Sequence, residues 1–87
     1  MIFALIYWYD SIFEICFTSN ADSKEEFLCK ASLNTELQER YRDDYNSLVE
    51  KGYFEGSIEN YLKYYFRYDD YMSVISYESE DNIGEEN

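Results

Sequence analysis

The chain has 87 residues, and its 19 acidic and 7 basic side chains give a formal net charge of −12. It contains eleven tyrosines and no histidine. A negative potential repels nucleic acid and anionic membrane surfaces and attracts cationic groups. The composition therefore disfavours direct binding to nucleic acid or membrane and predicts a basic protein partner.

The length predicts one domain with a single core. We expect an α+β domain over residues 1–80, followed by an acidic, disordered tail over residues 81–87 that has too few apolar residues to stay ordered. The last ten residues carry a charge of −5, which leaves −7 on residues 1–77. The folded body is thus acidic without its tail.

Two apolar runs, residues 2–9 and 12–19, flank the turn formers Asp10 and Ser11 and predict a β-hairpin. A signal peptide or membrane span is the alternative, but the run lacks a basic leader and is interrupted by Asp10 and Glu14. The first run is apolar on both faces, which is typical of a central strand. In the second run a period of two places Phe13, Ile15 and Phe17 on one face and Glu14, Cys16 and Thr18 on the other, wet face.

Three helices are expected next, each with a start signal. The capping box Ser23–Glu26 begins a helix that runs to about Leu33, and Thr35–Gln38 repeats the signal for a longer helix that ends at Gly52. A third helix should start at Ser57 and end near Asp69 or Asp70. The apolar positions at helical spacing are Leu37, Tyr41, Tyr45, Leu48 and Val49 in the second helix and Ile58, Tyr61, Leu62, Tyr65 and Phe66 in the third.

Residues 71–80 contain β-branched and aromatic side chains and predict a last strand that flanks the first. The resulting fold class is α+β, a ββαααβ two-layer sandwich in which about three antiparallel strands carry helices on one face.

Catalysis is poorly supported, and we expect a non-enzyme. Without histidine no side chain has an ordinary pKa near neutrality. Cys16 and Cys29 could pair with each other, but we interpret both as reduced, buried core thiols. The neighbouring carboxylates of Asp43-Asp44 and Asp69-Asp70 diverge by about 100° on a helix, so they are more typical of solvated faces than of catalytic dyads.

No metal or other cofactor is predicted. Zinc would require a cluster of cysteine and histidine, and the acidic segment 81–86 lacks the ligand spacing of a calcium loop. A glycine-rich phosphate cradle is absent as well, because Gly52, Gly56 and Gly84 are isolated from one another.

Four carboxylates of the predicted second helix follow the spacing i, i+3, i+7, i+14, and we name Glu36, Glu39, Asp43 and Glu50 the acidic stripe. Carboxylates one turn apart are separated by about 5–6 Å along the axis, which is close to the spacing of successive phosphates on one strand. The stripe could therefore replace a DNA backbone in a channel lined by lysine and arginine. The alternative is the solvent side of an amphipathic helix.

A second candidate surface lies on the third helix. Tyr64, Tyr68 and Tyr71 follow the spacing i, i+4, i+7 and are expected to point away from its apolar face, beside Glu55, Glu59, Asp69 and Asp70. Tyrosine is enriched at interface hot spots, and its ring stacks on guanidinium groups. A core that uses tyrosine in place of leucine is the alternative.

In size, charge and aromatic content the chain resembles the small acidic inhibitors that bacteriophages and mobile elements use against host nucleases, namely anti-CRISPR and DNA-mimic antirestriction proteins. The resemblance implies a non-enzymatic inhibitor that occupies the basic nucleic-acid-binding site of a nuclease or CRISPR effector in the bacterial cytoplasm. The chain is also similar to nuclease immunity proteins through its Tyr64-Tyr65 pair, although its strands depart from their all-helical fold. A further alternative is a structural or regulatory interaction module that dimerises through exposed tyrosines.

Overall fold

The computed structural model describes residues 1–77, which form a sheet and three helices in the order ββαααβ. The elements are β1 (Ile2–Tyr9), β2 (Ile12–Asn20), α1 (Lys24–Ser32), α2 (Thr35–Glu50), α3 (Ile58–Tyr68) and β3 (Met72–Tyr77). The α+β class and the order of elements predicted from the sequence are therefore confirmed. The predicted tail 81–87 and the end of the strand predicted over 71–80 lie outside the described residues.

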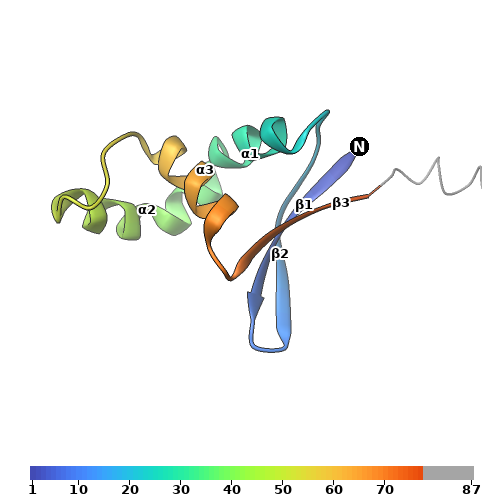
Figure 1. Cartoon of the computed structure of the whole chain (residues 1–87), viewed down its shortest axis with the longest axis horizontal. Coiled ribbons are helices and arrows are strands. Elements are labelled where there is room, and N and C mark those ends of the chain that lie inside the picture. Colours follow the sequence, from blue (N-terminus) through green and yellow to red (C-terminus); the bar gives the residue numbers. More distant parts are fainter. Residues whose placement is uncertain (78–87) are drawn as a thin grey trace, which may run out of the picture.

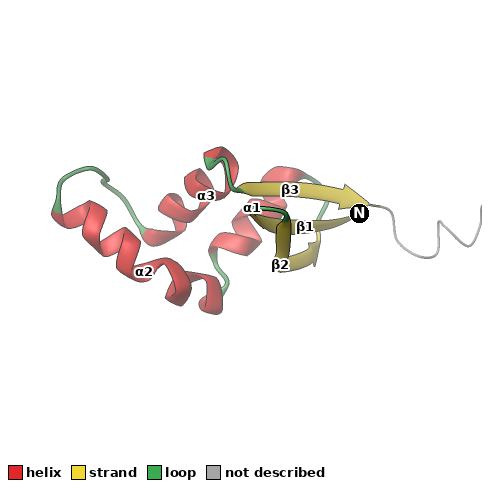
Figure 2. Ribbon diagram, turned by 90° about the horizontal axis from the view of Figure 1, so that it is seen from below, coloured by secondary structure: helices red, strands yellow, loops and turns green. Residues whose placement is uncertain are grey.

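The three strands form an open antiparallel sheet in the order β2-β1-β3. β1 is central, as its apolar character on both faces predicts. α1 and α3 lie against the sheet, whereas α2 packs along α3 and projects away from the strands (Figure 1). Figure 2 shows the same arrangement from below, with the α2–α3 pair at one end of the molecule and the sheet at the other.

A β-bulge at Cys16 changes the faces of β2. Leu5 pairs with Phe17 but the next residue, Ile6, pairs with Ile15, so Cys16 has no partner in the ladder. Because directly paired residues share a face, Phe17 points with Leu5 toward the helices while Ile15 points to the opposite side. The prediction that Phe13, Ile15 and Phe17 share a face is therefore wrong, and the extra residue of the bulge is the reason.

The core lies between the helix-facing side of the sheet and the helices α1 and α3. The largest apolar side chains that are 0–1% exposed are Leu5, Phe27, Leu28, Leu62 and Phe66. The ring of Phe27 lies 5.4 Å from that of Phe3 and 5.7 Å from that of Phe17, which joins α1 to both β1 and β2. Full burial of such side chains stabilises the fold by about 1.5–3 kcal/mol each.

The helix starts agree with the sequence at two of three positions. The hydroxyls of Ser23 and Ser57 accept hydrogen bonds from the N–H groups three residues later, at 3.1 and 3.2 Å. The cap of α2 is Asn34 rather than Thr35, because the Asn34 side chain accepts a hydrogen bond from Leu37 N at 3.0 Å. At the far end of α2, Gly52 adopts φ +76°, the left-handed conformation that the sequence predicts there.

Candidate functional site

The candidate site is the helical pair α2–α3, whose connecting loop, residues 51–57, is held by side chains of α2. The Tyr45 hydroxyl donates a hydrogen bond of 2.6 Å to the carbonyl oxygen of Gly56. The Tyr45 ring also meets Phe54 edge-on at a centroid distance of 6.1 Å. Because these contacts join α2 to the loop, the projecting end of the pair is an ordered surface.

All four residues of the acidic stripe are exposed on α2. Glu39 is paired with Arg42 on the next turn, with 3.5 Å between Oε1 and Nε. The spacing of one turn holds from Glu36 through Glu39 to Asp43, but seven residues separate Asp43 from Glu50, which is a rise of about 10 Å. The phosphate-like spacing is therefore confined to the first half of the helix.

Each arginine forms an ion pair with a glutamate: Arg40 with Glu14, Arg42 with Glu39, and Arg67 with Glu25. Residues 1–77 contain fourteen carboxylates, so eleven of them form no ion pair with another described residue. Eight of these eleven belong to the segment that runs from α2 through α3 to the turn before β3: Glu36, Asp43, Asp44, Glu50, Glu55, Glu59, Asp69 and Asp70. Among the described residues, negative charge without a counter-charge is therefore concentrated on the projecting helical pair and the turn that follows it.

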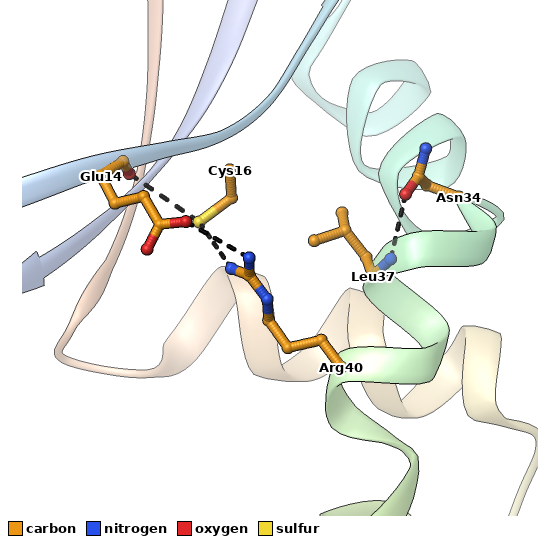
Figure 3. Close-up of polar contacts among 5 residues, drawn as sticks. All are labelled: Glu14, Cys16, Asn34, Leu37 and Arg40. Atoms are coloured by element: carbon orange, nitrogen blue, oxygen red, sulfur yellow. Dashed lines mark hydrogen bonds and ion pairs between the residues drawn. The ribbon is translucent and has the colours of Figure 1, made fainter.

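Arg40 connects α2 to the sheet beside the bulge (Figure 3). Its guanidinium donates to Glu14 Oε2 at 3.3 Å and to Cys16 Sγ at 3.7 Å. Burial, followed by the charge of Glu14, raises the pKa of the Cys16 thiol, which disfavours the reactive thiolate. Both cysteines are free, and Cys29 is exposed, so the prediction of a core thiol is wrong at that position.

A cavity of about 400 Å³ opens between α2 and α3, and we name it the tyrosine pocket. Its lining residues are Leu48 from α2 and Tyr61, Tyr64, Tyr65, Tyr68 and Asp69 from α3 and its C-terminal cap. The rings of Tyr64 and Tyr68 lie 4.9 Å apart, and each of these residues is 63% exposed. The prediction that these two tyrosines lie outside the core is consistent with this exposure.

Asp69 contributes the charged group of the pocket lining. Its Oδ2 atom accepts a hydrogen bond of 3.0 Å from the backbone N–H of Tyr71, which orients the carboxylate. Burial raises the pKa values of Tyr61 and Tyr65, and the charge of Asp69 contributes to both increases. The pocket thus combines neutral phenol rings with one carboxylate that has no counter-charge among residues 1–77.

Tyr71 does not extend the pair formed by Tyr64 and Tyr68. α3 ends at Tyr68, and Asp69 has an extended backbone, so the helical spacing does not continue to residue 71. The Tyr71 ring instead lies 6.5 Å from that of Tyr7 on β1. The predicted third member of the tyrosine group therefore belongs to the sheet end of the molecule.

The acidic stripe and the tyrosine pocket face different directions. At 100° per residue, the stripe residues lie about 120–180° around the axis of α2 from Leu48, which lines the pocket. The structure thus places most of the predicted residues on the helical pair and its adjoining loops, but on two sides of the pair, and places Tyr71 at the sheet end. Glu55 lies in the loop between the helices, Glu59 in the first turn of α3, and Asp70 in the turn before β3.

The sequence prediction missed an apolar surface on the side of the sheet away from the helices, which we name the outer sheet face. Its exposed members are Trp8, Phe13, Ile15, Ile75 and Tyr77. The Trp8 ring lies 5.3 Å from Phe13, and its Nε1 atom donates to Ser73 Oγ at 3.0 Å across to β3. Phe13 and Ile15 lie on this face because of the bulge, and Ile75 and Tyr77 because of the register between β3 and β1, and the local sequence marks neither.

Within residues 1–77 no group of three or more acidic or cysteine side chains is arranged to hold a metal ion. The helices of the same segment are too short or too polar to cross a membrane. In comparisons of sequence and of fold, the chain matches no protein family, no curated protein and no solved structure.

Proposed function

We propose that the chain is a non-enzymatic inhibitor that binds the basic nucleic-acid-binding site of a nuclease or CRISPR effector and acts there as a DNA mimic. The observation that carries this proposal is the set of eight carboxylates, on the projecting α2–α3 pair and the turn that follows it, that form no ion pair among residues 1–77. Apart from the three arginines, which form ion pairs, the segment contains two cationic side chains, Lys51 and Lys63. The excess of negative charge suits a surface that normally binds phosphates.

The shape of the helical pair supports insertion into a groove. α2 contacts α3 and projects away from the sheet (Figure 1). The acidic stripe is exposed on α2, so a positively charged channel could contact it directly. Carboxylates offer no bond for a nuclease to cleave, so the channel would be blocked and the inhibitor left intact. Such an inhibitor acts in the cytoplasm of the bacterium whose nuclease it blocks.

The experiment is a DNA-cleavage assay with a panel of purified RNA-guided nucleases and restriction endonucleases. We expect inhibition of at least one enzyme, relief of that inhibition by excess unlabelled DNA, and slower complex formation as ionic strength rises. Inhibition of no enzyme in the panel would contradict the proposal. Inhibition that excess DNA does not relieve would contradict the DNA-mimic mechanism.

A second candidate is a structural or regulatory interaction module, and the outer sheet face is the observation that favours it. Trp8, Phe13 and Ile15 are 43%, 53% and 56% exposed and form an apolar surface. Two copies could pack these faces together without bringing charged side chains into contact, because none of the five residues of this face is charged. Dimerisation would then use the sheet and not the tyrosines of α3.

A further inference from the structure

We propose that the tyrosine pocket binds the guanidinium group of an arginine side chain supplied by the protein partner. The inference rests on the proposed function, since that function requires a basic partner, and it adds the side chain that the pocket recognises. The cavity of about 400 Å³ falls at the lower end of the usual size range of ligand pockets, roughly 300–1,000 Å³.

The lining of the pocket is complementary to a cation. The faces of aromatic rings attract cations placed within about 6 Å, and the exposed residues Tyr64 and Tyr68 line the cavity with two rings whose centroids are 4.9 Å apart. Asp69 supplies a carboxylate on the same lining. Among residues 1–77 no lysine or arginine lines the cavity, so no resident cation competes there with an incoming one.

The geometry favours arginine over lysine. A planar guanidinium can stack on a tyrosine ring while its edge donates to a carboxylate, whereas the ammonium of lysine is a compact and strongly hydrated charge. One oxygen of Asp69, Oδ2, is already held by the N–H of Tyr71. The remaining acceptor capacity of this oriented carboxylate is what the edge of the guanidinium would use.

The test is an NMR titration of the full chain with N-acetyl-arginine methylamide. The matched probes are the citrulline analogue, which has nearly the same shape without the charge, and the lysine analogue. We expect saturable shifts at Leu48, Tyr64 and Tyr68 with arginine, weaker binding of lysine, and no saturable shift with citrulline. Equal binding of arginine and citrulline, or no saturable shift with arginine, would overturn the proposal.

Variants with internal controls locate the site. Tyr68→Leu removes one ring and Asp69→Asn removes the charge, and we expect each to weaken arginine binding by roughly three- to tenfold. The matched controls are Tyr53→Leu, at a tyrosine that is 76% exposed in the loop, and Asp70→Asn, at the neighbouring carboxylate. Equal losses of arginine affinity in the variants and their controls would show that the acidic surface attracts the probe diffusely. The proposal that the pocket binds arginine would then be wrong.

The outcome is separable from that of the proposed function. If the chain inhibits a nuclease in competition with DNA but does not bind the arginine probe, the proposal that the pocket binds arginine is wrong, and the proposed inhibitory function is unaffected. If the probe binds at the pocket but no nuclease is inhibited, the arginine-binding proposal is supported and the proposed inhibitory function is wrong. Circular dichroism of each variant confirms that the comparison is made on folded protein.

Discussion

The ring of Tyr41 on α2 lies 5.0 Å from the ring of Tyr65 on α3, at an interplanar angle of 54°. The same Tyr41 ring meets Phe66 edge-on at 5.7 Å. These contacts join the projecting helix α2 to the core side of α3. The tyrosines that anchor α2 are thus partly or fully buried, whereas Tyr64 and Tyr68 on the neighbouring side of α3 remain exposed.

Alkaline pH should unfold the chain through these buried phenols. Burial raises the pKa of Tyr41 to about 12, and burial together with neighbouring Tyr41 also raises that of Tyr65. A raised pKa in the folded state means that stability is complete below the ordinary value of about 10 and is lost as the pH rises toward 12. For Tyr41 alone the loss amounts to roughly 2–3 kcal/mol.

Phenolate absorbance and circular dichroism, recorded together during an alkaline titration, check this prediction. Tyr41→Phe should remove a component of the phenolate signal that appears late, together with unfolding, because burial raises the pKa of Tyr41 to about 12. If every tyrosine ionised near its ordinary pKa while the fold persisted, the burial of Tyr41 and Tyr65 would be contradicted.

The cap of α2 provides a second prediction. Asn34→Ala should lower the free energy of unfolding by about 0.5–2 kcal/mol, because it removes the acceptor for Leu37 N. Thr35→Ala is the matched control and should cost less, since Thr35 is already inside the helix. Urea denaturation measures both losses. A larger loss for Thr35→Ala would contradict the Asn34 cap and would indicate that Thr35 caps α2, as predicted from the sequence.

The two thiols should differ in reactivity. Cys29 is exposed, whereas Cys16 is half-buried and has a raised pKa, so a thiol reagent in mildly alkaline buffer should label Cys29 first. Cys29→Ser should remove the fast phase and Cys16→Ser the slow one. The reverse assignment would contradict the placement of Cys16 beside Arg40 and Glu14.

The oligomeric state distinguishes the two candidate functions. The inhibitor proposal predicts a monomer in analytical ultracentrifugation at the concentrations that inhibit a nuclease. A dimer that Ile15→Thr dissociates and Tyr64→Leu does not would support the interaction module and place its interface on the outer sheet face. Both side chains are largely exposed, at 56% and 63%, so neither substitution should change stability by more than about 0.5 kcal/mol.

Local patterns predicted most of the fold. Alternation, helical spacing and the serine caps depend on neighbouring residues, so the elements and their order could be read before the structure was known. The same patterns placed Val49 with the apolar side of α2, but it is 42% exposed, because α2 projects beyond the sheet and only part of its length has a covering layer. Local spacing does not reveal how far a helix extends past its partners.

Long-range relationships at the site were not predictable in the same way. The bulge at Cys16 changes which apolar residues of β2 reach the core, and nothing in the local sequence marks it. The ion pair between Arg40 and Glu14 joins residues 26 positions apart. The tyrosine pocket likewise requires Leu48 of α2 to meet α3, so the sequence predicted exposed tyrosines but not the cavity between them.

In the proposed function, carboxylates on the projecting helical pair take the place of phosphates, and a matched pair of double variants tests this role. Glu36→Gln/Asp43→Asn neutralises two stripe residues that have no ion-pair partner among residues 1–77, and Asp10→Asn/Asp22→Asn makes the same change of charge near the sheet. Asn also tolerates the positive φ of 55° at position 10. The measurement is the inhibition constant against the nuclease identified in the DNA-cleavage panel. We expect the stripe variant to inhibit roughly 2- to 30-fold less well while the control retains its potency; equal potency of the two variants would contradict the proposed DNA mimicry.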